Sequence, residues 1–321
     1  MIDFPTLLRK NSVAFITSGA NVAKGNINIH CPFCGSADPS YHLGIRLSDG
    51  AWGCWREPSH RGRRPHRLLR KLFGWSVLRI QSEISIDRNQ PLFSTTGQPT
   101  KKRFEKVVMP DNFRPLRFER GQLLYCNYLI DHRGYDTSEI NEMSQKYDLR
   151  VALSGEWEGR IIIPVYDHEG RLQTWVGRAV KNNLSRYKAC TNDETVPIKE
   201  SLWISPDWDR SQVLVLTEGP FDAITVDLRG QSVGLSAACI FGAELSQRQE
   251  SLLRAYASCF DLVVIALDRE NLAGTLGLTK RLVGFRVMPM GMDTKDPGDM
   301  TKDELVEWGM EITNRASLPI V

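Results

Sequence analysis

The chain has 321 residues and a formal net charge of +3, which leaves room for two or three domains with a sizeable core. Its charges are unevenly divided: residues 1–120 hold 20 Lys and Arg against 9 Asp and Glu, whereas residues 121–321 hold 21 against 29. A basic part joined to an acidic part suggests a polyanion that one part binds and the other handles chemically.

No apolar stretch approaches the eighteen or so residues of a membrane span, so we expect no membrane partner. The seven cysteines are irregularly spaced and do not suggest a disulfide framework. The first ten residues, MIDFPTLLRK, lack the apolar core of a signal peptide. We therefore expect a cytoplasmic protein, located in the bacterial host cytoplasm if it is phage-encoded.

A metal-ligand pattern follows a short strand that ends near residue 30. Cys31-Pro-Phe-Cys34-Gly places two thiolates at the spacing of a zinc knuckle, and Cys54-x5-His60 follows after 19 residues. Three cysteines and one histidine complete a tetrahedral set, and four protein ligands favour a structural zinc ion over a catalytic one. Since the second half is not the usual Cys-x2-Cys, three other histidines remain rivals for the fourth position: His30, His42 and His66.

Residues 41–55 alternate around a turn at 48–50, which predicts a β-hairpin between the two halves of the site and a zinc ribbon over residues 1–80. The segment 60–74 is rich in arginine and has an apolar stripe at helical spacing. Arginines there would follow phosphates, and nearby aromatic rings, Tyr41 among them, would stack on unpaired bases. The alternative is a solvated helix face with aromatic residues in the core. The candidate DNA contacts are Arg61, Arg63, Arg64, Arg67, Trp52 and Trp55.

Residues 81–106 lose periodicity and gather Ser, Thr, Gln, Pro and Lys, which predicts a flexible linker. We then expect residues 107–205 to form an α+β subdomain with a basic hairpin. It contains a helix over 123–129, a second helix capped by Thr137 or Ser138, and two strands, 161–165 and 172–176, joined by a turn. This hairpin carries Arg160, Arg171 and Arg178.

Acidic residues follow three predicted strands of the last segment, residues 206–321. The strand 213–216 leads to Glu218, and Asp222 sits one turn into the helix that Pro220 begins. The strand 262–267 ends at Asp268 and Glu270, and a strand over 285–290 is followed by two further aspartates, Asp296 and Asp299. Because ligands bind beyond the carboxyl ends of strands in an open α/β sheet, we expect these carboxylates to converge and to bind Mg²⁺ or Mn²⁺.

These three acidic motifs resemble the Toprim domain of primases, topoisomerases and some nucleases. One departure is Asp268-Arg269-Glu270, where the Toprim family usually has Asp-x-Asp; a glutamate there would ligate a cation with one more methylene of reach. The zinc ribbon resembles the N-terminal domain of DNA primases, especially phage-type ones, and residues 159–203 are similar to the segment before the Toprim domain of DnaG-type primases. The resemblance implies a multi-domain α/β chain: a zinc ribbon, a basic α+β subdomain, and a Toprim domain with a Rossmann-like, mostly parallel sheet.

The resemblance implies a primase that makes short RNA primers on single-stranded DNA by metal-dependent nucleotidyl transfer. The implied cofactors are one structural zinc ion and two or more Mg²⁺ or Mn²⁺ ions. Glu218 would be a general base or a metal ligand, and Asp222 would support it. The implied catalytic residues are Glu218, Asp222, Asp268 and Glu270; the implied magnesium ligands are Asp268, Glu270, Asp296 and Asp299; the implied nucleotide and template contacts are Arg178, Arg186, Lys188 and Lys199.

The implied partners are single-stranded DNA, nucleoside triphosphates and a separate replicative helicase, because no GxxxxGK[ST] loop occurs in the chain. Two alternatives use the same motifs: a Toprim nuclease, and a non-catalytic zinc and Toprim protein that only binds single-stranded DNA. A topoisomerase is disfavoured because its tyrosine nucleophile needs a large DNA-gating domain. The order of the domains and the basic hairpin favour the primase.

Overall fold

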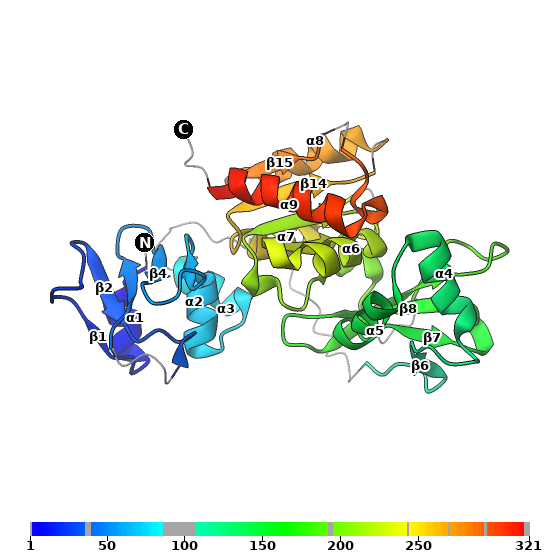
Figure 1. Ribbon diagram of the computed structural model, residues 1–321, viewed down its shortest axis with the longest axis horizontal. Coiled ribbons are helices and arrows are strands. Elements are labelled where there is room, and N and C mark those ends of the chain that lie inside the picture. The colour runs from blue at the N-terminus through cyan, green and yellow to red at the C-terminus, as the bar shows by residue number, and fades with distance from the viewer. Residues whose placement is uncertain are drawn as a thin grey trace. The chain divides into compact units, whose positions relative to one another are not determined.

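A computed structural model of the chain describes residues 2–35, 40–85, 107–191, 195–242, 244–268, 270–291 and 294–317. The chain divides into two compact units (Figure 1). The first contains residues 1–99 and 255–261, and the second contains residues 100–254 and 262–321. None of the helices in the described ranges has the length and apolar character needed to span a membrane.

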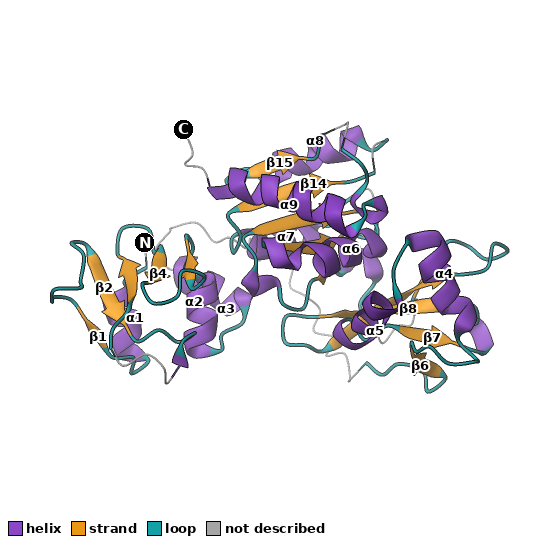
Figure 2. Cartoon of the chain, in the orientation of Figure 1, coloured by secondary structure: helices purple, strands orange, loops and turns teal. Residues whose placement is uncertain are grey.

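The first unit is built on a small antiparallel sheet in which each strand pairs with its neighbours in the sequence (Figure 2). Its strands are β1 (Phe15–Ile16), β2 (Asn26–Ile29), β3 (Leu43–Arg46), β4 (Trp52–Cys54) and β5 (Arg61–Gly62). The predicted turn between β3 and β4 is present, and Gly50 adopts a φ of 76° there. A side chain at Gly50 would be strained by this φ and would meet the Phe4 ring at 3.2 Å.

Helices α1 (Phe4–Lys10), α2 (His66–Phe73) and α3 (Val77–Ser85) bury their apolar sides with this sheet in one core. The predicted helical stripe after the zinc motif is confirmed, because Leu68 and Leu69 of α2 are fully buried. One boundary was wrong: residues 81–85, which we expected in the linker, are the end of α3, and Gln81 is buried. The rest of the predicted linker, residues 86–106, lies outside the described residues.

The second unit contains an antiparallel sheet with the strand order β10-β9-β8-β7-β6. Its strands are β6 (Phe113–Pro115), β7 (Arg150–Ala152), β8 (Arg160–Tyr166), β9 (Leu172–Ala179) and β10 (Tyr187–Ala189), and its helices are α4 (Leu123–Arg133) and α5 (Thr137–Lys146). The predicted basic hairpin is β8 and β9. The cap of α5 is Asp136 and not Thr137 or Ser138. The Asp136 carboxylate accepts from the Glu139 backbone N–H at 2.8 Å, and the Glu139 carboxylate accepts from the Asp136 backbone N–H at 2.9 Å.

The other sheet of this unit is mostly parallel and has the order β11-β13-β12-β14-β15. Its strands are β11 (Trp203–Ile204), β12 (Val213–Thr217), β13 (Leu235–Cys239), β14 (Leu262–Ala266) and β15 (Val287–Pro289), and β11 alone runs antiparallel to its partner. Trp203 and Ile204 belong to this sheet, so the boundary lies before residue 203 and not at 206. The strand order reverses at β12, and ligands bind at such a point beyond the strand ends.

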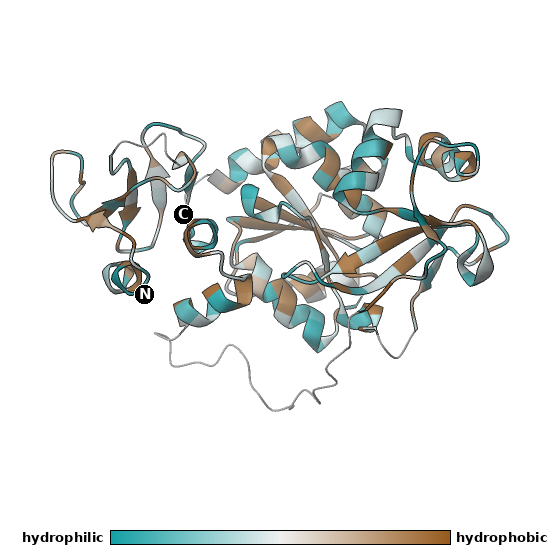
Figure 3. Cartoon of the chain, turned by 90° about the horizontal axis from the view of Figure 1, so that it is seen from below, coloured by the Kyte–Doolittle hydropathy of each residue, from teal (hydrophilic) through white to brown (hydrophobic). Residues whose placement is uncertain are grey.

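Helices cover this parallel sheet, and the strands β12, β13 and β14 are buried along their whole length, which is typical of a sheet covered on both faces. The helices are α6 (Pro220–Gly230), α7 (Gln247–Ala257), α8 (Leu272–Arg281) and α9 (Lys302–Ser317). α6 packs against α9, and α8 packs against β14 and β15. Figure 3 shows the central strands mostly in the hydrophobic colour and the helices with mixed colours, as expected for amphipathic helices around a core.

A buried arginine joins helices and loops that lie beside the two sheets of the second unit. Arg229 of α6 is 6% exposed and pairs with Glu139 of α5 at 2.7 Å. It also donates to the Met300 carbonyl at 2.6 Å and to the Gly134 carbonyl at 2.9 Å. One side chain therefore connects α6, α5 and the loop that carries Asp299.

Replacing Arg229 with alanine is expected to lower the free energy of unfolding by roughly 3–5 kcal/mol, because the largely buried Glu139 carboxylate would lose the guanidinium with which it pairs. Arg171→Ala is the control: its side chain is 68% exposed and its pair with Asp167 should contribute less than about 1 kcal/mol. Chemical denaturation of the full chain, followed by circular dichroism, measures both. Equal losses for the two variants would contradict this role for Arg229.

Candidate functional site

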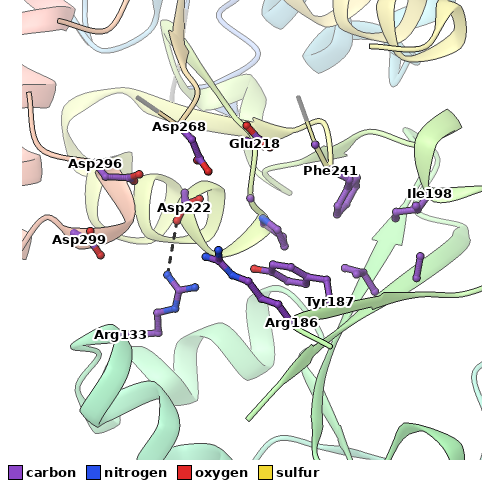
Figure 4. A pocket seen from close by; sticks show the side chains of 15 residues that line it. Arg133, Arg186, Tyr187, Ile198, Glu218, Asp222, Phe241, Asp268, Asp296 and Asp299 are labelled. Atoms are coloured by element: carbon purple, nitrogen blue, oxygen red, sulfur yellow. Dashed lines mark ion pairs between the residues drawn. The ribbon is translucent and has the colours of Figure 1, made fainter. Parts of the chain in front are cut away.

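A cavity of about 400 Å³ lies in the second unit at the carboxyl ends of β12 and β14, with β9 and β10 on another side (Figure 4). Its size is typical of a site for one small ligand. The residues that line it are Arg133, Val176, Arg186, Tyr187, Ala189, Ile198, Glu218, Gly219, Pro220, Asp222, Phe241, Gly242, Asp268, Asp296 and Asp299.

Five carboxylates reach this cavity from three segments. Glu218 follows β12 and Asp222 lies in the first turn of α6; Asp268 follows β14; Asp296 caps a short 3₁₀ turn, Pro297–Asp299, and Asp299 is its last residue. The strand ends bring these segments together as the sequence predicted. Of the described residues of the second motif, however, only Asp268 is among the lining residues of the cavity; Glu270 is not, although both residues are exposed.

The carboxylates are crowded and partly removed from water. Burial, with the negative charge of Asp296 next in importance, raises the pKa of Asp222 to about 7. Burial and Asp296 also raise the pKa of Asp268, and burial and Asp268 raise that of Glu218. Oxygen donors that repel one another in this way fit a hard divalent cation such as Mg²⁺ or Mn²⁺, whose charge would relieve the repulsion.

Basic side chains face these acids. Arg186 lines the cavity, and Figure 4 shows it between the carboxylates and the aromatic side of the cavity. Arg133, at the end of α4, pairs with Asp222 at 3.8 Å and is 11% exposed. Lys199 lowers the pKa of Glu218 by its charge and donates to the Phe241 carbonyl at 2.6 Å. Of the basic residues implied by the resemblance, Arg186 therefore lines the cavity, and Lys199 lies beside it without being among the lining residues.

The other two basic residues lie differently. Arg178 of β9 is directly opposite Tyr187 of β10, lies over its ring at 4.9 Å and donates to the Tyr128 hydroxyl at 2.9 Å. It flanks the cavity without being among the lining residues. Lys188 pairs with Glu156 at 2.5 Å and lies over the Trp157 ring at 4.8 Å. Since Tyr187 and Ala189 face the cavity, the alternation of the strand turns Lys188 to the opposite face.

The first unit brings the predicted zinc ligands together. The ligand atoms of Cys31, Cys34, Cys54 and His60 all lie within 4.8 Å of one another. The Cys31 and Cys34 sulfurs are 3.6 and 3.4 Å from His60 Nδ1, and the Cys34 and Cys54 sulfurs are 3.9 Å apart. A tetrahedral zinc ion with ordinary bond lengths requires S–N edges of about 3.5 Å and S–S edges of about 3.8 Å. The four residues therefore fit zinc.

The three rival histidines have other contacts. His30 packs against Tyr41 with ring centroids 4.2 Å apart and the ring planes tilted by 36°, and the Ser40 hydroxyl lies 3.2 Å from His42 Nε2. His66 is buried, with Gln81 2.8 Å from its Nε2. His60 is thus the histidine that the fold brings to the cysteines.

Not all of the proposed DNA contacts are available. Trp52 is 5% exposed, stacks on Phe33 at 5.2 Å and donates to the Arg64 carbonyl at 2.9 Å, so it is a core residue and was wrongly predicted as a stacking surface. Arg67 lies over the Phe33 ring at 5.0 Å. Trp55 is 54% exposed and Arg61 and Arg63 are exposed, so these three remain candidates, with the half-buried Arg64 beside them.

A comparison with curated proteins finds a DNA primase of Clostridium acetobutylicum that is 26% identical over 205 residues. The chain is similar to bacterial DNA primases. A primase of Thermotoga maritima is 25% identical over 159 residues, and the two matches cover 62% and 46% of this chain. They cover 31% and 27% of the relatives, so the chain spans less than a third of the length of the primases that it matches. The resemblance predicted from the sequence is confirmed.

Solved primase structures are also among the similar proteins, and no family model matches the chain. A DnaG primase catalytic domain bound to single-stranded DNA has a TM-score of 0.47 at 15% identity and covers 63% of this chain and 74% of that one. The zinc-binding and RNA polymerase domains of the Aquifex aeolicus primase give 0.44 at 17%, covering 97% and 81%. The primase fragment of the bacteriophage T7 primase-helicase gives 0.44 at 14%, covering 88% and 98%.

Several lining residues were not predicted, among them Arg133, Tyr187 and Phe241. Arg133 precedes the glycine that ends α4, and a basic residue in the last turn is ordinary for a helix, so nothing in the local sequence distinguishes it. Phe241 follows β13, a strand that was not predicted either. Tyr187 directly follows Arg186. Once β10 was assigned, the alternation of side chains along the strand would have predicted that Tyr187 faces the cavity.

The raised pKa of Asp222 predicts a dependence of stability on pH. The pKa is about 7 in the folded chain against 3.8 ordinarily, so between these values the folded chain holds a proton that the unfolded chain has released. The free energy of unfolding should fall as pH rises from about 4 to 7. Asp222→Asn removes this slope and should raise stability at pH 8, without added divalent cation, by up to about 4 kcal/mol.

Denaturation at pH 5 and pH 8 measures this effect. Asp303→Asn is the control, since Asp303 is exposed at the start of α9. A pH slope that is the same in the native chain and in Asp222→Asn would show that Asp222 is ionised at low pH like an ordinary aspartate.

Proposed function

We propose that the chain is a DNA primase that joins nucleotides into short RNA primers on single-stranded DNA, a nucleotidyltransferase of the DNA-directed RNA polymerase type. The observation that carries the proposal is the set of five carboxylates at one cavity, with Arg186 opposite them, in a chain similar to DNA primases. We assign the mostly parallel sheet to a Toprim domain, with the acidic segments after β12, β14 and β15 as its three motifs.

The side chains of the cavity suit this chemistry. Asp268, Asp296 and Asp299 would hold divalent cations, and Glu270 would add negative charge beside Asp268, whose pKa it raises. Bound Mg²⁺ or Mn²⁺ ions would neutralise the triphosphate and lower the pKa of an attacking 3′-hydroxyl. Arg186 and Lys199 would contact phosphate oxygens. Glu218 would accept the hydroxyl proton or ligate a cation. Asp222, paired with Arg133, would have a supporting role beside Glu218.

The first unit would hold the template. A zinc ion on Cys31, Cys34, Cys54 and His60 would fix the knuckle to β4, while Trp55 and the arginines of residues 61–64 would contact a single strand. We propose that a separate replicative helicase opens the duplex.

The test is synthesis on single-stranded DNA of mixed sequence with labelled ribonucleoside triphosphates and Mg²⁺. Short labelled oligomers that require both the DNA and the metal would support the primase. Shortening of the DNA would favour a nuclease that admits water in place of the 3′-hydroxyl. DNA binding without either product would leave a non-catalytic DNA-binding protein.

A further inference from the structure

The cavity has two chemically different sides. The carboxylates lie together on one side in Figure 4, whereas Phe241, Ile198 and Tyr187 lie on the other, with Arg186 between them. Val176 and Ala189, paired across β9 and β10, extend the apolar side. A ligand that matches both sides has an anionic group at one end and a flat apolar group at the other.

Phe241 has an unusual backbone conformation for its position in this wall. Its φ is 57°, in the left-handed region that a bulky side chain seldom adopts, and Gly242 follows with a φ of 135°. Such residues persist where the surrounding structure holds them, and they are frequent in binding sites. We therefore expect a contact that holds Phe241 in this conformation.

Lys199 provides that contact. Its ammonium group donates to the Phe241 carbonyl at 2.6 Å, and a Cβ atom at position 242 would clash with the same nitrogen. On the other side, the Phe241 N–H donates to the Cys239 sulfur at 3.3 Å. The turn after β13 is thus fastened on both sides, and Lys199, which precedes it by some forty residues in the chain, comes from the segment that also supplies Ile198.

We propose that the Phe241 side of the cavity is the subsite for the base of a bound nucleotide, with the Phe241 ring as its stacking wall. This inference rests on the proposed function and deepens it. The triphosphate would lie toward the carboxylates and Arg186. The base, at the other end of the nucleotide, would then lie on the apolar side of the cavity. Lys199 then acts as a positioning residue for Phe241 in addition to its charge near Glu218. A flat ring accepts any base, so the subsite provides affinity rather than choice among bases.

The test compares two ligands, a nucleoside triphosphate and inorganic tripolyphosphate, each titrated with Mn²⁺ into the full chain by calorimetry. They share the charged end and differ in the base. Phe241→Ala should weaken binding of the nucleoside triphosphate on the order of 5- to 150-fold and leave tripolyphosphate within about twofold. Phe241→Trp should retain the affinity, whereas Phe241→Leu, which keeps apolar volume without a flat ring, should lose part of it.

Phe118→Ala is the matched control, because Phe118 is 37% exposed in the same unit and does not line the cavity. Equal losses for both ligands in Phe241→Ala, or no loss for either, would overturn the base subsite while leaving the proposed function in place. If the native chain bound neither ligand, the proposed function itself would fail and the subsite with it.

Discussion

Glu218→Gln is expected to reduce primer synthesis by at least about 100-fold while leaving the fold intact. The substitution preserves the size of the side chain and an oxygen that can accept from the Asn271 amide, which lies 3.4 Å from the Glu218 carboxylate. It removes a negative charge from a cluster in which burial and Asp268 already raise the pKa of Glu218. A lost proton acceptor costs about 10²- to 10⁴-fold in rate, and a lost metal ligand has a comparable effect.

The dependence of the rate on Mg²⁺ separates the two roles that the sequence left open for Glu218. A metal ligand replaced by glutamine should raise the Mg²⁺ concentration needed for half-maximal rate, and high Mg²⁺ should restore part of the activity. A lost general base should leave that concentration unchanged and lower the rate at saturation. The measurement is oligomer yield against Mg²⁺ concentration for the native chain and the variant.

Two further glutamates give the controls. Glu307→Gln changes an exposed position of α9 and should retain full activity. Glu270→Gln tests the departure from the Asp-x-Asp motif: because Glu270 is not among the residues that line the cavity, we expect a loss well below that of Glu218→Gln. Full activity in Glu218→Gln would remove this residue from the mechanism.

Elements and site residues that can be recognised from a short stretch of sequence were predicted well. The strands β12 and β14 are short runs of branched aliphatic residues, so their burial and their ends were readable, and with them the positions of Glu218 and Asp268. The cysteine pair and the hairpin that follows it defined the zinc motif in the same way. Convergence of the acidic segments then needed only the general rule on strand ends in α/β sheets.

Features that depend on tertiary contacts were missed. The strand β13, LSAAC, consists of small residues without periodicity, and its burial comes from lying between β11 and β12. Without β13 neither Phe241 nor the boundary before Trp203 could be found. The error on Trp52 is of another kind, because side chains two apart in a strand share a face. Trp52 and Cys54 are such a pair, so a buried Cys54 already implied a buried Trp52.

Cys34→Ser is expected to remove the bound zinc and to destabilise the first unit by several kcal/mol without unfolding the second. Structural zinc binding is folding free energy because the unfolded chain has no preformed site. The cysteine sits in the knuckle, and its sulfur lies 3.9 Å from that of Cys54, on β4. The first unit has a core of its own, with Phe4, Ile27 and Leu43 fully buried, so partial order should persist without the metal.

Zinc content per chain and limited proteolysis together measure this effect. Cys259→Ser is the control, since Cys259 is also half-buried but is not part of the four-residue cluster. The pair His60→Ala and His42→Ala decides the fourth ligand, with loss of zinc expected for the first alone. Retention of one zinc ion per chain in Cys34→Ser would contradict the site. Because the carboxylate cavity lies wholly in the second unit, Cys34→Ser should also retain binding of nucleoside triphosphate while losing synthesis on DNA. This result would separate a role of the zinc-binding unit in template binding from a role in the chemistry.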